Sequence, residues 1–145
     1  MIKIEHSVVV DRPVEEVFAY ATDVSKVPEW QTSALEARVD GPMQAGATGA
    51  IVRKFLGRRM ESTVRFDEYE PPRKFAIEAT SGPVQFHVHQ TYESEGAGAA
   101  RINIVMEGEP AGFFKLAEPL VERAIRREME ANFATLKDIL EARSS

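Results

Sequence analysis

The chain has 145 residues, of which 43% are hydrophobic and 28% charged, a composition typical of one globular domain. It contains no cysteine, which excludes disulfides, thiolate metal ligands and cysteine nucleophiles. Its 18 Lys and Arg residues are outnumbered by 23 Asp and Glu residues, giving a net charge of −5. Nucleic acid is therefore not expected as a partner, because affinity for a phosphate backbone comes from an excess of basic residues. Residues 1–145 are expected to form a single domain.

The beginning of the chain does not predict a targeting segment. Residues 1–13 carry charges at Lys3, Glu5 and Asp11 and lack the apolar stretch of a signal peptide. No apolar run approaches the roughly 20 residues of a transmembrane helix. We therefore expect a cytoplasmic protein without stable membrane insertion.

The first elements are a strand and two short helices. Residues 2–10 alternate between apolar and polar side chains, which predicts a β-strand with one buried face. The sequence Asp-Arg-Pro at 11–13 predicts the start of a short helix that ends near residue 23. Residues 24–31 predict a further helical turn that leads into a loop.

From residue 34 onward, short β-like runs are separated by Gly and Pro turn signals, which predicts six more strands. Their connections are too short for parallel crossovers, so the seven strands are expected to form an antiparallel meander. One alternating face of these strands is apolar and the other is charged, so one side of the sheet should face solvent. The six strands are expected at 34–40, 50–56, 59–70, 73–80, 84–94 and 100–108.

The hydrophobic period then changes to that of a helix over 113–142, which would be roughly 40 Å long and could cross the sheet. This order of elements predicts an α+β fold. The apolar stripe of the helix has small residues in its first half and larger ones in its second, so a looser contact with the sheet is expected near 117–124. The stripe comprises Phe113, Ala117, Leu120, Val121, Ala124, Ile125, Leu136 and Ile139.

Four polar side chains interrupt these apolar faces and are the candidate site residues. Glu128 and Asn132 fall in the middle of the helix stripe, where they either sit at its edge or line a hollow and hydrogen-bond a ligand or trapped water. Gln90 lies between apolar positions of its strand and is either a satisfied core amide or a pocket residue. His6, on the apolar side of the first strand, is either a core residue or a general base.

His87 and His89 project from the same side of one strand, as two ligands of a metal site would. They share that side with Gln85 and Thr91 on the predicted solvent face, and the pattern offers no third ligand. An exposed polar ladder is the simpler interpretation, so neither a metal nor another cofactor is expected. The sequence also lacks nucleophile-elbow, zinc-protease and phosphate-loop motifs.

Four short sequence segments are notable for their order and spacing along the chain. They are Val8-Val-Val-Asp-Arg-Pro-Val-Glu-Glu-Val-Phe18, Asp23 through Trp30, Phe66-Asp-Glu-Tyr-Glu-Pro-Pro72, and Gly108-Glu-Pro110. Together they resemble the START-like (SRPBCC) superfamily and, within it, the polyketide cyclase/dehydrase and lipid transport-like proteins. The resemblance covers nearly the whole chain. It implies a helix-grip fold, in which a seven-stranded antiparallel sheet curves around a long C-terminal helix, with two short helices between strands 1 and 2 and an apolar cavity beneath the long helix.

The resemblance also implies a cavity wall made of sheet residues, Trp30 and the first half of the long helix. The inward cluster of Tyr, Arg, Ser and His that polyketide aromatases use is absent from the pattern, so a binding function is favoured over an enzymatic one. The expected ligand-binding residues are Trp30, Val64, Phe66, Ile77, Phe86, Val88, Gln90, Ile104, Met106, Phe113, Ala117, Val121, Ala124, Glu128 and Asn132.

Three functional hypotheses follow. The first is binding of a small hydrophobic ligand of the lipid, isoprenoid or polyketide/aromatic type, oriented by Gln90, Glu128 or Asn132. The second is a polyketide cyclase, dehydratase or hydrolase in which His6 or Glu128 acts as general acid or base. The third is an interaction module that docks a protein partner on the helix flank or a sheet edge. A homodimer is compatible with all three.

Overall fold

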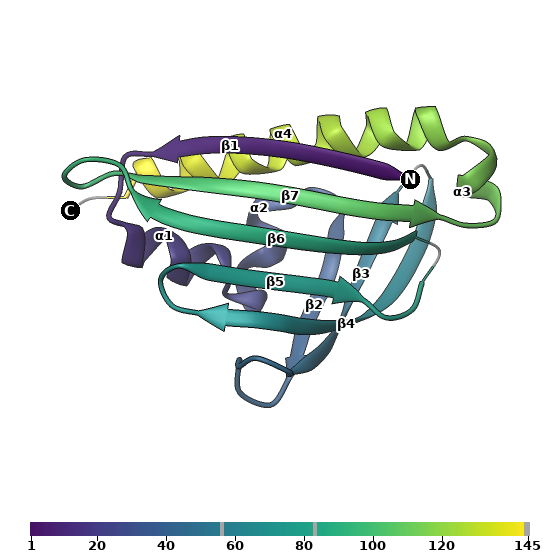
Figure 1. The fold of residues 1–145 in the computed structure, drawn as a ribbon, viewed down its shortest axis with the longest axis horizontal. Helices are drawn as coiled ribbons and strands as arrows, with labels where there is room; N and C mark the ends of the chain where they lie inside the picture. Colours follow the sequence, from purple (N-terminus) through teal and green to yellow (C-terminus); the bar gives the residue numbers. More distant parts are fainter. Residues whose placement is uncertain (56, 83, 144–145) are drawn as a thin grey trace.

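The computed structural model describes residues 1–55, 57–82 and 84–143, with the side chains of Val84 and Phe113 left aside. The described residues form one curved antiparallel sheet in the order β1-β7-β6-β5-β4-β3-β2 (Figure 1), which confirms the predicted meander. Its strands are β1 Ile2–Val10, β2 Ala34–Asp40, β3 Thr48–Phe55, β4 Arg58–Glu70, β5 Lys74–Ala79, β6 Val84–Ser94 and β7 Ala100–Pro110.

The helices lie on one side of this sheet. The long helix α4, Glu118–Glu141, runs along β1, and the sheet curves away from it (Figure 1). The short helix α2, Val27–Trp30, contacts both β2 and α4 and so bridges the two ends of the curved sheet. The predicted α+β helix-grip arrangement is therefore confirmed. No helix in the described part of the chain is long and apolar enough to cross a membrane.

Local sequence explains how the first helices begin. Helix α1, Val14–Ala21, follows Pro13 and has Glu15 and Glu16 in its first turn, where the helix dipole favours negative charge. The 3₁₀ turn η1, Val24–Lys26, is capped by Asp23, whose Oδ1 accepts a hydrogen bond from the backbone N–H of Ser25 at 3.1 Å. These two helix starts place α2 beneath the sheet.

The prediction of one uninterrupted helix over 113–142 is wrong. The structure has two helices, α3 Phe113–Leu116 and α4, separated at Ala117, whose φ of −110° and ψ of 29° are not helical. Pro119 in the first turn of α4 explains the break, because proline lacks an N–H and its ring clashes with the carbonyl group four residues earlier.

The looser packing predicted near 117–124 is also wrong. Val121 is fully buried in a core cluster that fills this region, and Leu120 is 57% exposed. The helix restarts after its break, so its buried stripe passes through Val121, Leu136 and Leu140 instead of Leu120. The other buried members of the cluster are Ile2, Ile4, Phe55, Met106 and Phe114.

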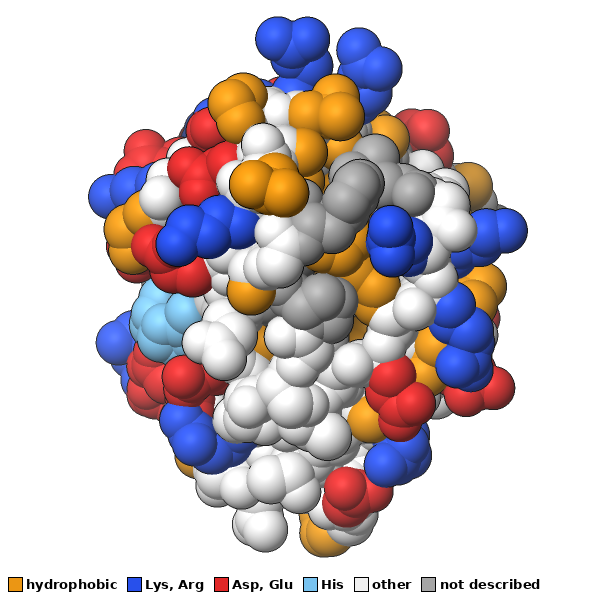
Figure 2. Space-filling model, turned by 90° about the vertical axis from the view of Figure 1, so that its right-hand side faces the viewer, with side chains coloured by type: hydrophobic (Ala, Val, Ile, Leu, Met, Phe, Trp, Pro, Cys, Tyr) orange, Lys and Arg blue, Asp and Glu red, His pale blue; other side chains and the backbone are white. Residues whose placement is uncertain are grey.

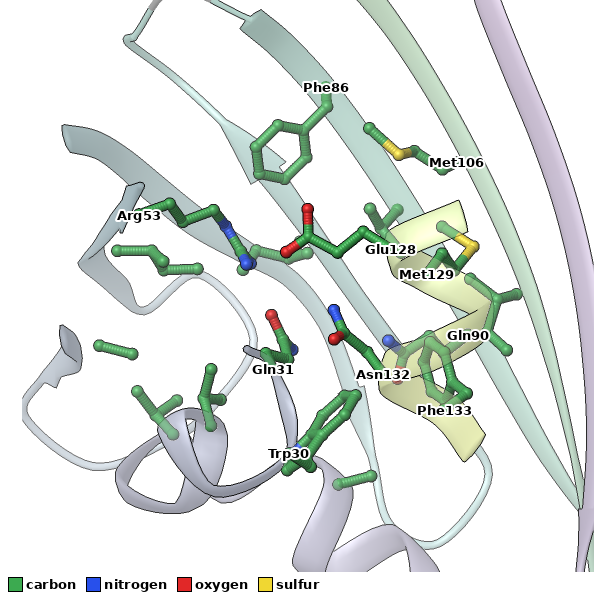
Figure 3. Close-up of a pocket in the computed structure, with 18 of the residues that line it drawn as sticks. Trp30, Gln31, Arg53, Phe86, Gln90, Met106, Glu128, Met129, Asn132 and Phe133 are labelled. Atoms are coloured by element: carbon green, nitrogen blue, oxygen red, sulfur yellow. The ribbon is translucent and has the colours of Figure 1, made fainter. Parts of the chain in front are cut away.

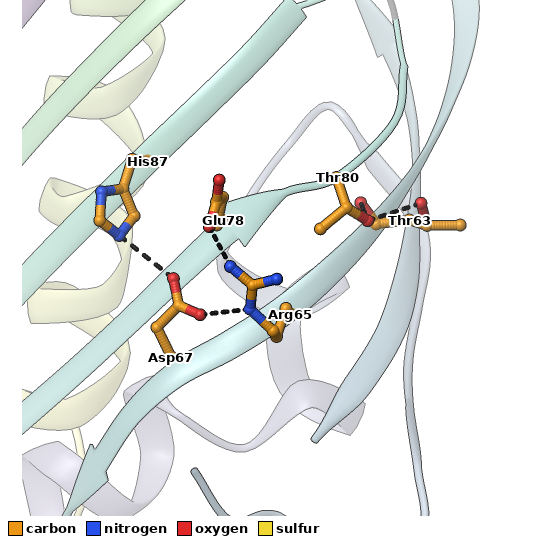
Figure 4. Close-up of polar contacts among 6 residues, drawn as sticks. All are labelled: Thr63, Arg65, Asp67, Glu78, Thr80 and His87. Carbon is orange, nitrogen blue, oxygen red and sulfur yellow. Dashed lines mark hydrogen bonds and ion pairs between the residues drawn. The ribbon is translucent and has the colours of Figure 1, made fainter. Parts of the chain in front are cut away.

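The outer face of the sheet carries the charged side chains that the alternation predicts. Arg65 Nε donates to Asp67 Oδ1 at 2.6 Å and the same guanidinium also contacts Glu78, while His87 Nε2 lies 3.3 Å from Asp67 Oδ2 (Figure 4). Exposed ion pairs of this kind contribute only about 0–1 kcal/mol each. Among the described residues, no group of three or more His, Asp or Glu side chains is placed to hold a metal ion.

Candidate functional site

A cavity of about 190 Å³ lies between the inner face of the sheet, α2 and the middle of α4 (Figure 3). An apolar cavity of about 150 Å³ accommodates benzene, so this one has room for a ligand of one to two rings. The predicted site residues that line it are Trp30, Phe66, Ile77, Phe86, Val88, Gln90, Ile104, Met106, Glu128 and Asn132.

The other predicted wall residues lie elsewhere. Val64 and Val121 are buried in the packed core, Ala117 lies at the break between α3 and α4, and Ala124 borders a neighbouring groove. The three helix positions are corrections with one cause, since the region below α3 is filled by side chains and the free space lies one to two helical turns further along. Val64, on β4, is a separate correction because it packs within the other core cluster. The side chain of Phe113 falls outside the described residues.

The candidate base His6 does not line the cavity. Its ring packs against Phe133, with the ring centroids 6.1 Å apart. Phe133 lines the cavity and therefore lies between His6 and the free space. Glu128 is therefore the only one of the two candidate acid–base groups that a ligand in the cavity could reach.

Several lining residues were not expected from the sequence, and Arg53 is the most consequential of them. It follows Ile51 on the inner face of β3, and its half-buried guanidinium points into the cavity (Figure 3). It lies between the apolar residues Ile51 and Phe55, but the buried Val52 beside it obscures the alternation that identified Gln90. The remaining unexpected residues are Ala21, Thr22, Val24, Val27, Gln31, Ala37, Ile51, Phe55, Met60, Ser62, Phe75, Ile125, Met129 and Phe133.

Arg53 and Glu128 give the cavity its charge. Their charged groups point toward each other from β3 and α4 (Figure 3). Burial lowers the pKa of Arg53, and the opposite charge of Glu128 counteracts that shift. Glu128 Oε1 is buried without a hydrogen-bond partner among the described residues, whereas Arg53 Nη1 donates to Ser33 Oγ at 3.4 Å. One carboxylate oxygen is thus free to accept a hydrogen bond from a ligand.

The uncharged polar groups are oriented so that their donors remain free. The Tyr92 hydroxyl donates to Gln90 Oε1, and the backbone N–H of Thr32 donates to Asn132 Oδ1 at 3.3 Å. Because each amide oxygen is occupied, the NH₂ groups of Gln90 and Asn132 are left for the cavity. Trp30 is 2% exposed, and its Nε1–H has no acceptor among the described residues. The cavity therefore offers donors from these three residues, while Gln31 and Ser62, which also line it, each carry both a donor and an acceptor.

A shallow groove borders the cavity on the outside, between α4 and the segment that joins α2 to β2. Phe55 and Glu128 line both hollows and so form the wall between them. Figure 2 looks onto the end of the molecule that carries α3 and shows hydrophobic side chains inside a hollow, with Lys and Arg side chains beside it. The groove is lined by Thr32, Ser33, Lys54, Phe55, Ala124, Arg127, Glu128 and Ala131.

Solved structures with the same fold come from several bacteria. TTHA0849 from Thermus thermophilus superposes with a TM-score of 0.84 at 16% identity, over 98% of this chain and 99% of that chain. The Zhui aromatase/cyclase from a Streptomyces species gives a TM-score of 0.82 at 17% identity, over 96% and 93%. A START superfamily protein from Mycobacterium smegmatis gives 0.80 at 12% identity, over 96% and 97%. At these identities the likeness shows the fold alone.

The sequence itself identifies the family. A search of the curated proteins found no match. Residues 1–141 match the family model described as polyketide cyclase/dehydrase and lipid transport, which spans nearly the whole chain. Because this match covers far more than half of the chain, it shows that the chain belongs to the polyketide cyclase/dehydrase and lipid transport family.

Proposed function

We propose that the protein binds a small, mostly apolar molecule of the polyketide or aromatic type in the cavity, and that this ligand carries carbonyl oxygens and one hydroxyl group. The observation that carries the proposal is the hydrogen-bonding inventory of the wall. Free donors belong to Trp30, Arg53, Gln90 and Asn132, Glu128 Oε1 is an acceptor without a partner among the described residues, and Gln31 and Ser62 each add a donor and an acceptor. Carbonyl oxygens fit the donors, and a hydroxyl fits the acceptor.

A plain hydrocarbon chain is a poorer fit to the same wall. Each buried polar group that a ligand leaves without a partner costs about 1–3 kcal/mol. An alkyl chain in the cavity would leave the Trp30 indole N–H and Glu128 Oε1 without a hydrogen-bond partner. The apolar rings Phe66, Phe75 and Phe86 provide the remaining wall, which suits a planar aromatic body.

The test uses Trp30 as an internal reporter, because it is the only tryptophan in the chain and it lines the cavity. We expect 7-hydroxychromone, which has a carbonyl and a hydroxyl, to change Trp30 fluorescence on binding. It should bind at least about tenfold more tightly than naphthalene, because each net hydrogen bond contributes about 0.5–1.5 kcal/mol. Equal affinity for the two bicyclic compounds contradicts the proposal, and tighter binding of fatty acids or isoprenoids favours a lipid carrier instead.

A matched pair of variants tests whether the cavity is the site. Ile125 lines the cavity, whereas Leu120, on the same helix, is exposed and does not. Ile125→Phe should fill the cavity and abolish binding, and Leu120→Phe should leave binding unchanged. Retention of wild-type affinity in a folded Ile125→Phe variant would place the ligand elsewhere.

A second candidate function, cyclase or dehydratase activity, is favoured by the buried free oxygen of Glu128. In a β-hydroxy ketone held by the donors, Glu128 would take a proton from the carbon next to the carbonyl, and the enolate oxygen would face Arg53 or Trp30. The C–C double bond then forms as the hydroxyl leaves and, with a proton returned by Glu128, departs as water.

Substitution of this carboxylate separates turnover from binding. Glu128→Gln keeps the shape of the side chain and should abolish dehydration of a β-hydroxy ketone while ligand affinity changes by less than about tenfold. Turnover measured by loss of water in mass spectrometry, and unchanged in Glu128→Gln, would eliminate this assignment.

A further inference from the structure

The groove beside the cavity has a charge that the proposed function does not use. Among the described residues, the charged residues that line the two hollows are the cations Arg53, Lys54 and Arg127 and the single anion Glu128. This cationic excess occurs on a chain with a net charge of −5. The sign of the charge at the groove is thus opposite to that of the protein as a whole.

Two of these cations are not neutralised by the protein. Lys54 and Arg127 are exposed, and neither forms an ion pair with any described residue, although the adjacent Arg126 pairs with Glu122 at 3.4 Å. The β3–β4 register also sets Arg59 directly opposite Lys54. Like charges at opposed positions of two strands destabilise the pair. A bound anion beside Lys54 would relieve this repulsion.

The groove and the cavity are close enough to share one ligand. Phe55 and Glu128 line both hollows, and Ser33 in the groove accepts the hydrogen bond from Arg53 Nη1. The Glu128 carboxylate points into the cavity toward Arg53 (Figure 3), and Glu128 is the one anion that also lines the groove. A ligand that reaches from the cavity to Lys54 would therefore have to pass this shared wall of Phe55 and Glu128.

We propose that the groove is a subsite for a compact anionic group, a carboxylate or a phosphate, carried by the ligand whose aromatic part occupies the cavity. This inference rests on the proposed function and narrows its ligand to an aromatic acid. Ammonium and guanidinium groups bind carboxylates and phosphates through charge-assisted hydrogen bonds, which are stronger than neutral ones. Lys54 and Arg127 contact the anionic group, and the wall residue Phe55 packs against the atoms that join it to the rings.

Two pairs of compounds that differ only by the acid group test this subsite. Chromone is compared with chromone-2-carboxylate, and 1-naphthol with 1-naphthyl phosphate, by calorimetry and Trp30 fluorescence at low salt. We expect at least one acid to bind about five- to tenfold more tightly than its neutral partner, and this preference to shrink as salt is added. The pair with the larger preference identifies whether the group is a carboxylate or a phosphate.

Variants that remove positive charges test which residues cause the preference for acidic compounds. The double variant Lys54→Gln/Arg127→Gln should abolish the preference for the acid, with each substitution lowering the affinity for the acid about two- to fivefold. The affinity for the neutral compounds should not change. The control is Arg73→Gln with Lys74→Gln, which removes the same charge from an exposed part of the sheet that lines neither hollow. The control should keep the full preference.

The outcomes separate the two proposals. Equal binding of neutral and acidic partners, or full preference retained in the Lys54 and Arg127 double variant, overturns the subsite and leaves the proposed function standing. Failure of all four compounds to bind overturns the proposed function and the subsite with it.

Discussion

Arg53 and Glu128 face each other across the cavity, yet no ion pair joins these two described residues (Figure 3). Burial disfavours the charge of Arg53, and the carboxylate of Glu128 is what offsets this cost across the gap. The separation leaves space between two charged groups that a ligand's polar atoms can enter. The charge of Arg53 is therefore supported by a carboxylate with which it forms no ion pair.

This relationship predicts non-additive effects on stability. Arg53→Met should lower the free energy of unfolding in both the wild type and a Glu128→Gln background. The loss should be about 1 kcal/mol larger in the wild type, because only there does the substitution leave the Glu128 carboxylate without a positive neighbour. Urea denaturation of the two single variants and the double variant measures this coupling. Strict additivity would show that the two charges are independently solvated.

The bond between Tyr92 and Gln90 predicts a change in ligand preference. Tyr92→Phe removes the hydroxyl that occupies Gln90 Oε1 and should reduce stability by about 1 kcal/mol. It should also reduce the advantage of carbonyl-bearing ligands, because the Gln90 amide is then free to turn its oxygen toward the cavity. Tyr69→Phe, which alters a half-buried tyrosine outside the cavity wall, is the control and should leave ligand preference unchanged.

Tyr20 predicts a loss of stability at high pH. Burial, together with the hydrogen bond that its hydroxyl donates to Glu29 Oε1 at 2.8 Å, raises the pKa of Tyr20 to about 12, against about 10 in the unfolded chain. Because its pKa is higher in the folded state, protonated Tyr20 contributes fully to the free energy of unfolding below about pH 10. This contribution disappears as the pH rises toward about 12. Burial raises the pKa of Tyr92 as well, so both residues act in the same direction.

Denaturation at about pH 8, 10 and 11 checks the sign and the assignment. The free energy of unfolding should fall with pH in the wild type and fall less steeply in Tyr20→Phe, since that variant has lost one of the two shifted groups. An identical slope in the two proteins would mean that Tyr20 ionises equally well in the folded and unfolded states.

Gly49 predicts a steric effect that its neighbours do not share. A Cβ at this position would overlap the carbonyl oxygen of Arg38 on the paired strand β2, which cannot move without breaking the pairing. Gly49→Ala should therefore cost more than about 2 kcal/mol. At Gly108 the same added carbon would meet Gln85 O at 3.4 Å, an ordinary contact, and Gly108→Ala should cost less than about 1 kcal/mol. Thermal melts of both variants compare them directly.

Much of the fold could be predicted because its signals are local. Alternation along β1 and the Gly and Pro turns between the later strands placed every strand to within two residues of its observed bounds. The break between α3 and α4 was missed because Ala117 fits the helical period, although Pro119 two residues later was the visible sign of a new helix start.

The site was predictable where a polar residue interrupts an apolar pattern. Gln90, Glu128 and Asn132 were recognised in this way, and all three line the cavity. Arg53 was missed because Ile51 and Val52 are both buried, so β3 does not show the alternation that would mark Arg53 as inward-facing. The position of the hollow could not be predicted either, because it depends on where α4 crosses the curved sheet, a property of tertiary packing.

The two cavity amides differ in how their orientation can change during evolution. A backbone N–H holds the oxygen of Asn132, and no substitution at Thr32 other than proline removes that group. A phenol holds the oxygen of Gln90, and a single exchange at Tyr92 deletes it. The orientation of one cavity amide is consequently specified by the backbone itself, while that of the other depends on a single side chain.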